Sequence, residues 1–207
     1  IAKEILQRKE YAWEILDDIK TYIIELGSKL SEDTYDKFGE NIWIAKTAKI
    51  SESAEINGPC IIDENAEIRH CAYIRGNVIV GKNTVVGNST ELKNCILFDD
   101  VQVPHFNYVG DSVLGHKAHM GAGAHTSNLK NDKSNIDIKI EEDNVIHTGM
   151  NKLGAIIGDC VEIGCNSVLC PGTVICKNVN IYPLSLVKGV IEPNTVYKNN
   201  NEIIKKF

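Results

Sequence analysis

The segment PHFNYVGD, residues 104–111 of the 207-residue chain, carries a histidine and a tyrosine three positions apart. Imidazole titrates near neutral pH, so a correctly placed histidine can remove a proton from a reacting group. His105 is therefore a candidate for acid–base chemistry. The alternative interpretation is that His105 only marks a place where the regular pattern of the chain is interrupted.

The pattern around His105 is a six-residue repeat of apolar side chains, which suits neither an amphipathic helix nor the two-residue alternation of a strand. It suits a prism in which each hexapeptide forms one flat side and three sides complete a coil. Stacked coils bury a continuous column of aliphatic side chains. The first series comprises Ile44, Ile50, Ile56, Ile62, Ile68, Ile74, Val80, Val86, Leu92 and Phe98, and the second comprises Ile157, Ile163, Leu169, Ile175, Ile181 and Val187. Mostly small or branched residues follow four positions after the first nine and are also expected to face inward, namely Ala48, Ala54, Cys60, Ala66, Ala72, Val78, Thr84, Thr90 and Ile96.

Two other segments must pack around this solenoid. Residues 2 to about 30 carry apolar side chains at helical spacing that end at Gly27, which predicts one amphipathic helix that caps or buttresses a side of the prism. The repeat slips between Phe98 and Leu114, and it is lost in a polar segment from Ser127 to about Ala155. We therefore divide the chain into an N-terminal helical segment, 1–36, and a solenoid domain, 44–198, with a polar loop excursion at 127–155.

Composition restricts the class of protein. Hydrophobic residues make up 43% of the chain and charged residues 24%, and the formal net charge of −6 is spread without long blocks of one sign, so we expect a globular protein that binds no nucleic acid. No apolar run approaches the ~20 residues of a membrane span, and the N-terminal residues lack the apolar core of a secretion signal, so we expect no membrane association and a cytoplasmic location. The seven cysteines include no C-x-x-C pair, which argues against a zinc ribbon or a full disulfide framework.

The six-residue period also has a consequence for two cations. Arg75 and Lys93 are 18 residues apart, which is three sides of six and therefore one complete coil. Side chains at that separation lie one above the other on the same side of a prism. The pair could thus hold a single anion between two positive charges.

Four segments carry a resemblance to a known family, namely NSTELKN (88–94), VPHFNYVGDSVLG (103–115), GAGAHTSN (121–128) and HTGMNKLGAIIGD (147–159). Over about residues 44–190 the chain resembles the hexapeptide-repeat acyltransferases, and within them the acetyltransferase domain of bifunctional N-acetylglucosamine-1-phosphate uridyltransferases. The resemblance implies an all-β solenoid, the left-handed parallel β-helix, whose handedness is an exception to the right-handed crossover rule. It also implies a homotrimer with sites between subunits. No glycine-rich nucleotide-binding signature precedes Ile44, so we expect the nucleotidyltransferase domain to be absent from this chain.

The implied reaction moves an acetyl group from acetyl-coenzyme A (acetyl-CoA) to the 2-amino group of an amino-sugar 1-phosphate, and it needs no metal. It requires a base, cations for the phosphate and amide donors for the oxyanion. By the resemblance, His105 is the general base. The same resemblance assigns substrate binding to Arg75, Lys93, Tyr108 and His119, and contacts with acetyl-CoA to Ala122, Asn128, Leu129 and Cys165.

The sequence departs from the family pattern at two single residues and in one three-residue segment. His119 stands where an asparagine usually contacts the sugar, Leu129 replaces an aromatic residue, and Met150–Asn151–Lys152 is less basic than in close relatives. The sugar is therefore open between glucosamine 1-phosphate, galactosamine 1-phosphate and related compounds.

Two alternatives also stay open at this point. One is a zinc hydratase of the hexapeptide-repeat carbonic anhydrase type, with His116, His119 and His125 as ligands. The other is a non-catalytic assembly subunit that has kept the prism and lost turnover.

Overall fold

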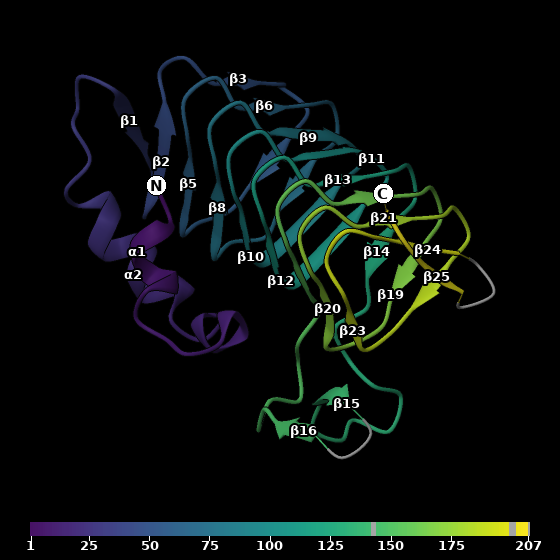
Figure 1. Cartoon of the computed structure of the whole chain (residues 1–207). Coiled ribbons are helices and arrows are strands. Elements are labelled where there is room, and N and C mark those ends of the chain that lie inside the picture. The colour runs from purple at the N-terminus through teal and green to yellow at the C-terminus, as the bar shows by residue number, and fades with distance from the viewer. Residues whose placement is uncertain (142–143, 199–201, 207) are drawn as a thin grey trace.

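The computed structural model describes residues 1–141, 144–198 and 202–206, and a solenoid of short parallel strands makes up most of it (Figure 1). The solenoid is a left-handed parallel β-helix of about eight turns, as the repeat and the resemblance predict. Its coils are in register, because Ile44 pairs with Ile62 on the next coil and Ile62 pairs with Val80. The side chains of the second series are buried at each predicted position, whereas at the start of the first series Ile44 and Ile56 are half-buried and Ile50 is 36% exposed.

Three flat faces make up each coil. The first face contains β2 (Ile42–Ala45), β5 (Cys60–Ile62), β8 (Val78–Val80), the second halves of β10 (Glu91–Leu97) and β12 (Tyr108–Leu114), β17 (Ala155–Ile157), β20 (Thr173–Ile175) and β23 (Val190–Ile191). The second face contains β3 (Lys49–Ile50), β6 (Glu67–Ile68), β9 (Val85–Asn88), β11 (Gln102–His105), β13 (His119–Met120), β18 (Glu162–Ile163), β21 (Asn180–Ile181) and β24 (Thr195–Tyr197), with β25 (Ile203–Lys205) antiparallel to β24. The third face contains β4 (Glu55–Ile56), β7 (Tyr73–Ile74), the first halves of β10 and β12, β14 (His125–Thr126), β19 (Val168–Leu169) and β22 (Leu186–Val187).

The corners between faces use left-handed backbone, which asparagine tolerates better than most residues. Asparagine supplies many of these corners, including Asn65, Asn77 and Asn83, with φ between 54° and 58°. Short strands separated by asparagine-rich corners thus form flat sides and sharp turns from local sequence.

The phase of the repeat slips earlier than predicted. Leu97, not Phe98, enters the core, where it pairs with Val80 at a spacing of 17 residues. Cys95 takes the inward position that was expected for Ile96, and Ile96 points outward instead. Both residues are apolar, so their chemistry alone does not reveal which one faces the core.

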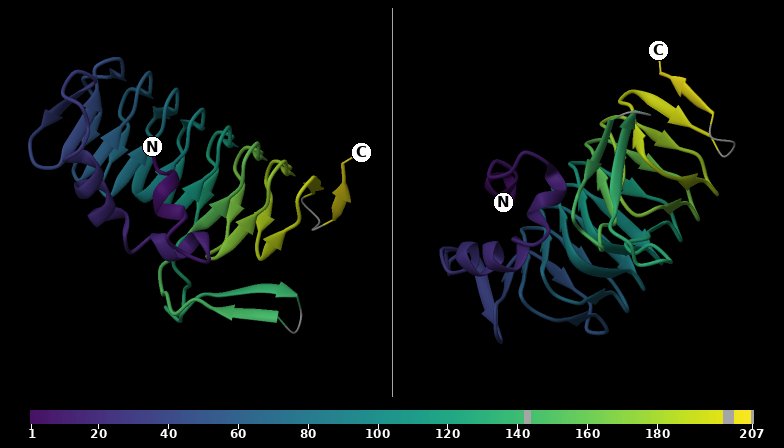
Figure 2. Two further views of the ribbon diagram at one scale, coloured as in Figure 1. Left: turned by 60° about the vertical axis from the view of Figure 1, so that its left-hand side comes forward. Right: turned by 90° about the horizontal axis from the view of Figure 1, so that it is seen from below.

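The prediction of one long N-terminal helix is wrong, because the segment is broken into α1 (Lys3–Leu6), the 3₁₀ helix η1 (Ala12–Ile15) and α2 (Ile19–Gly27). These helices lie along one side of the solenoid, so the predicted buttress is present (Figure 2). They cover the first face, where α2 contacts β5, β8 and β10, and η1 contacts β12. The eight adjacent strands of the first face span about 34 Å, whereas a straight helix over residues 2–30 would be about 43 Å long. The segment must therefore turn to keep its apolar side chains on that face. None of the helices in the described part of the chain is long and apolar enough to cross a membrane.

The predicted excursion leaves the third face after Thr126 and rejoins the first face at Ala155. It forms a two-stranded antiparallel hairpin, β15 (Asp137–Glu141) and β16 (Asn144–His147), which projects from the solenoid (Figure 2). Residues 142 and 143, inside the predicted excursion, lie outside the described residues. The two ends of the excursion, which form its neck, are joined by a 3.0 Å hydrogen bond from Leu153 N–H to the Asn128 carbonyl oxygen. The division of the chain into domains at 1–36 and 44–198 stays a prediction.

Candidate functional site

Arg75 and Lys93 occupy equivalent positions on successive coils of the third face. Tyr73 and Ile74 pair with Glu91 and Leu92, and Arg75 N–H donates to the Leu92 carbonyl oxygen over 2.9 Å. Each cation directly follows a buried core residue, so both side chains point outward at the corner between the third and first faces. The stacking that the 18-residue spacing predicts is therefore present.

Each of these cations is paired with its own carboxylate. Arg75 Nη1 lies 2.7 Å from Glu91 Oε1, and Lys93 Nζ lies 3.1 Å from Asp111 Oδ2. The first pair is exposed, with 43% and 34% of the side chains accessible, and exposed pairs contribute only about 0–1 kcal/mol. The Lys93 pair differs, because its carboxylate is almost fully buried.

Asp111 is 4% exposed and accepts hydrogen bonds from side chains of two segments, β10 and the start of the excursion. Besides Lys93, its carboxylate accepts hydrogen bonds from Asn94 Nδ2 over 2.9 Å and from Asn128 Nδ2 over 2.5 Å. A buried charge requires this kind of compensation. The carboxylate consequently fixes Lys93 and the start of the excursion at one corner.

Tyr108 lies beside this cluster on the third face. Its hydroxyl oxygen accepts a hydrogen bond from Asn128 Nδ2 over 3.3 Å. Burial raises the pKa of Tyr108, as do the charges of Asp111 and Glu91, while Arg75 and the Asn128 hydrogen bond act in the opposite direction. The phenol therefore stays protonated at neutral pH and can donate its O–H to an anion.

His105 lies at the other corner, between the second and third faces, and its side chain is exposed. Backbone hydrogen bonds join Gly123 N–H to the His105 carbonyl oxygen over 3.0 Å and Asn166 N–H to the Ala122 carbonyl oxygen over 2.9 Å. His105, Ala122 and Cys165 thus follow one another along this corner on successive coils. Three of the predicted site residues are brought into one column.

Asn107 holds this corner together, and the sequence interpretation missed it. The residue is 2% exposed, and its Oδ1 accepts the backbone N–H of His105 over 3.1 Å. Its Nδ2 donates to the carbonyl oxygens of Gly121 and Ala124 on the next coil. A polar residue at a position between two apolar ones, as in HFNYV, is the signal that could have revealed it.

His119 and Cys165 line a shallow groove of about 250 Å³ on the second face. His119 Nδ1 lies 2.7 Å from Glu162 Oε2 on the adjacent coil. Within this chain His119 is therefore not brought to the cations, which lie at the far edge of the third face. Leu129 is exposed at the start of the excursion, next to Asn128.

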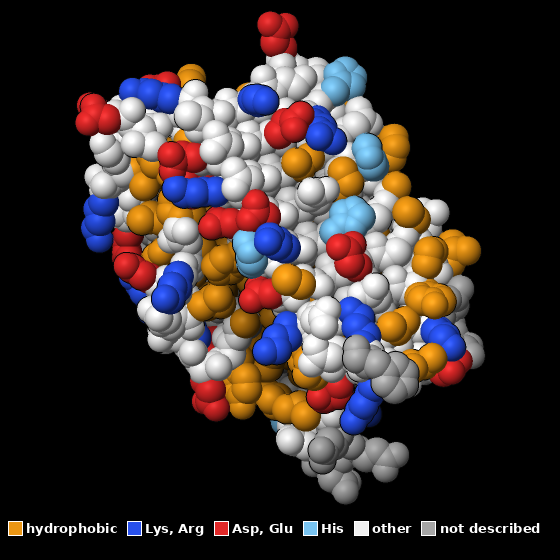
Figure 3. Space-filling model, turned by 45° about the horizontal axis from the view of Figure 1, so that its top comes forward, with side chains coloured by type: hydrophobic (Ala, Val, Ile, Leu, Met, Phe, Trp, Pro, Cys, Tyr) orange, Lys and Arg blue, Asp and Glu red, His pale blue; other side chains and the backbone are white. Residues whose placement is uncertain are grey.

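The three clustered histidines do not converge within the chain. His119 is on the second face and His125 on the third, while His116 Nδ1 lies 3.0 Å from the Asp99 carbonyl oxygen between the first and second faces. Among the residues that the structure describes, no group of three or more histidine, cysteine or acidic side chains is arranged to hold a metal ion. In the space-filling view, acidic and basic side chains are interspersed over the surface and histidines lie among them (Figure 3).

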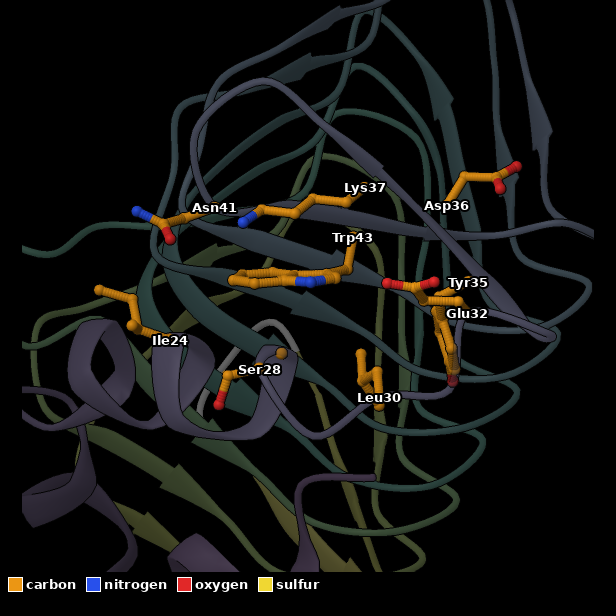
Figure 4. A pocket seen from close by; sticks show the side chains of 10 residues that line it. Ile24, Ser28, Leu30, Glu32, Tyr35, Asp36, Lys37, Asn41 and Trp43 are labelled. Atoms are coloured by element: carbon orange, nitrogen blue, oxygen red, sulfur yellow. The ribbon is translucent and has the colours of Figure 1, made fainter.

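A separate pocket of about 570 Å³ lies near the N-terminal end, between α2 and β1 (Tyr35–Phe38). The Trp43 indole lies across its middle, with Lys37 on one side of the ring (Figure 4). A Cβ atom on Gly27 would lie 2.5 Å from three atoms of that ring, so glycine is required for this packing. None of the predicted site residues lines this pocket.

Comparison with known proteins agrees with the solenoid and its repeat. The family model described as the GMPPB C-terminal domain matches residues 56–204. The chain belongs to this family. A protein of Methanococcus aeolicus named bifunctional protein GlmU is 36% identical over 200 residues, which cover 93% of this chain and 47% of that protein. The chain spans about half the length of the first curated relatives it matches.

Two further proteins extend the comparison. A Sulfurisphaera tokodaii protein named bifunctional sugar-1-phosphate nucleotidylyltransferase/acetyltransferase is 32% identical over 157 residues, which cover 67% of this chain and 39% of that protein. A solved structure of a hexapeptide transferase family protein from Anaplasma phagocytophilum has a TM-score of 0.54 at 16% identity, and the match covers 80% of this chain and 79% of that one. The structural likeness confirms the hexapeptide-repeat fold.

Proposed function

We propose that this chain transfers an acetyl group from acetyl-CoA to the 2-amino group of an amino-sugar 1-phosphate, with His105 as the general base. The observation that carries the proposal is the arrangement of the third face. An exposed imidazole lies at one edge, two stacked cations lie at the other, and Tyr108 lies between them. The names of the relatives, which include acetyltransferase and sugar-1-phosphate, support the same reaction class.

The phosphate would be held at the cationic edge. Glu91 competes only weakly with a phosphate for Arg75, because the Arg75–Glu91 ion pair is exposed to water and contributes little energy. Lys93 carries three N–H donors, so it can keep its contact with Asp111 and still donate to a phosphate oxygen. The protonated Tyr108 hydroxyl supplies a further donor next to them.

The amine would be placed at the other edge, near His105. The imidazole takes the proton from the amine nitrogen as that nitrogen attacks the thioester carbon, and the carbon–sulfur bond breaks as the coenzyme thiolate leaves. The backbone N–H of Ala122 makes no hydrogen bond within the described residues, and it is the donor we assign to the oxyanion.

The proposed acetyl-CoA contacts lie at two different corners of the prism. Ala122 and Cys165 are on the His105 corner. Asn128 and Leu129 are at the start of the excursion, near Asp111. We therefore propose a homotrimer in which one copy completes the site of the next. Phe106 and Leu184 support this, because they are 61% and 70% exposed on the His105 corner. Both also hold left-handed backbone, with φ of 52° and 60°, which is unfavourable for bulky residues.

The test follows thiol release from acetyl-CoA with a panel that includes glucosamine 1-phosphate and galactosamine 1-phosphate. We expect His105→Ala to lower the rate by roughly 10²- to 10⁴-fold, which is the usual contribution of general base catalysis. His116→Ala is the matched control, because His116 is a corner histidine outside the proposed site, and it should retain the parent rate. Equal rates for the parent and His105→Ala would remove His105 from the mechanism.

A further inference from the structure

A second cluster of reactive side chains lies on the corner between the second and third faces, in the first two coils. Cys71 Sγ lies 3.2 Å from His70 Nε2, and His70 Nδ1 lies 2.6 Å from Ser53 Oγ. All three side chains are exposed. A thiol next to a base that a third group orients is the arrangement found in activated cysteine nucleophiles.

The backbone of the corner fixes this geometry. Cys71 N–H donates to Ser53 Oγ over 3.1 Å, and Cys71 holds left-handed backbone with φ of 55°. The His70 carbonyl oxygen accepts hydrogen bonds from Ser89 N–H and Asn88 Nδ2 on the following coil. Thiol and imidazole are therefore held together by the solenoid and do not depend on a flexible loop.

The hydrogen-bond network is complete with one assignment of its protons. Ser53 Oγ accepts from Cys71 N–H and from His70 Nδ1–H, and it donates its own proton to Ser51 Oγ, 3.0 Å away. In this tautomer, which the proposal below requires, His70 Nε2 is unprotonated and faces the thiol; the opposite tautomer satisfies the same contacts with Ser53 Oγ as the donor to His70 Nδ1. The imidazole can then take the proton of Cys71.

The other thiols lack this environment. Cys160 and Cys165 are also exposed, but neither side chain makes a hydrogen bond to any base in the described part of the chain. Burial raises the pKa of the Cys60 thiol to about 12 and also raises the pKa of Cys95, so both stay protonated in the folded chain. Cys71 is thus distinguished by its partner as well as by its exposure.

A groove of about 340 Å³ on the second face ends at His70. Lys49 and Arg69 line it together with Glu67, whose carboxylate lies 3.1 Å from Arg69 Nε. Two positive charges against one negative charge leave a net charge of +1, which favours an anionic reagent.

From these contacts we propose that Cys71 is a modification site that reacts with small anionic disulfides. Cys71 S–H gives its proton to His70 Nε2, and the thiolate attacks one sulfur of the disulfide. The new sulfur–sulfur bond forms as the old one breaks, and the departing thiolate takes up a proton. Cys71 is oxidised to a mixed disulfide while the departing half is reduced to a thiol. The proposal does not depend on the acetyl-transfer reaction. Cys71 lies on the same corner as Phe106, two coils away, so the trimer proposed above must leave this end of the corner open to the reagent.

The experiment treats the folded full chain with the anionic disulfide 5,5′-dithiobis(2-nitrobenzoate) and locates the modified cysteines by peptide mass spectrometry. Cys71 should react about tenfold faster than Cys160 or Cys165, because His70 is placed to take the thiol proton as the sulfur attacks the disulfide. His70→Gln should lower the Cys71 rate by about the same factor and leave Cys160 unchanged. A Cys71 rate equal to that of the other two exposed thiols, or unchanged in His70→Gln, would overturn the proposal.

The charge preference has its own measurement. The ratio of the Cys71 rate to the Cys160 rate should be smaller with cystamine, a cationic disulfide, than with the anionic reagent. Lys49→Gln should bring the two ratios closer together. Equal selectivity with both reagents would show that the groove plays no part in choosing the electrophile.

Discussion

Replacing Asp111 by asparagine removes the negative charge that joins the cationic edge of the third face to the start of the excursion. The parent carboxylate accepts donors from Lys93, Asn94 and Asn128. An asparagine at the same position keeps one accepting oxygen but presents an N–H₂ group to donors that already carry hydrogen. At least one of the three donors is then left without a partner.

The magnitude depends on how well water can replace the lost contact. Breaking a buried ion pair by removing one partner costs about 3–5 kcal/mol. Because 27% of the Lys93 side chain is accessible, water can partly hydrate its ammonium group, and we expect the lower end, about 3 kcal/mol. For a chain of this length that corresponds to a fall of about 6–12 °C in Tm.

Urea unfolding followed by circular dichroism measures this change, and Glu91→Gln is the matched control. Glu91 also pairs with a cation on the third face, but the pair is exposed, so its loss should cost at most about 1 kcal/mol. Adding Lys93→Met to Asp111→Asn should recover part of the loss, because no unpaired ammonium remains. Equal small losses in Asp111→Asn and Glu91→Gln would refute the idea that the buried carboxylate holds this corner.

Two further predictions concern the alkaline stability and the assembly of the chain. The Tyr35 hydroxyl donates to Asp63 Oδ1 over 2.5 Å, and burial, followed by the Asp63 interaction, raises the pKa of Tyr35. The fold therefore favours the neutral phenol, so this stabilisation is complete below about pH 10, the usual pKa of tyrosine, and is lost as the pH rises further. Above that pH, the urea midpoint should fall less steeply with rising pH in Tyr35→Phe than in the parent. The exposed control Tyr182→Phe should behave as the parent does. Parallel curves for all three proteins would show that Tyr35 does not cause the alkaline loss of stability. Light scattering at micromolar concentration should give a trimer, and Phe106→Asp should shift it toward smaller species; a monomeric parent would exclude the proposed assembly.

Much of the solenoid could be predicted because apolar residues recur in the sequence every six positions. Ile62, Ile74 and Val80 face the core as the six-residue spacing requires. The slip at Leu97 could not be placed, because Phe98 is also apolar and is partly buried against the apolar cluster outside the solenoid core. A pattern of apolar residues does not distinguish an inward side chain from an outward one that another element covers.

The sequence nevertheless contained a signal for the covered face. On the first face the outward residue between two core positions is apolar in successive coils, as Ile61, Ile79 and Ile96 show, and all three are fully buried. On the second face, Glu67 precedes the core residue Ile68. An outward row of isoleucines on one face alone indicates where the helices pack.

The candidate site was predictable in part for a similar reason. The stacking of Arg75 and Lys93 follows from a backbone period, which does not depend on side-chain conformation. Their carboxylate partners Glu91 and Asp111 could not be derived, because hydrogen-bond partners depend on rotamers and on burial. The roles assigned to His105 and the other site residues stay predictions.

The closed neck of the excursion bears on how such a chain can change over evolution. Leu114 pairs with Ile157 as directly as Ile62 pairs with Val80, although 43 residues separate the first pair and 18 the second. Segments of different length can therefore replace one another between the third and first faces, while the strands of successive coils keep their register. New specificities can be acquired there by insertion or deletion, without the compensating mutations that a change inside a coil would demand.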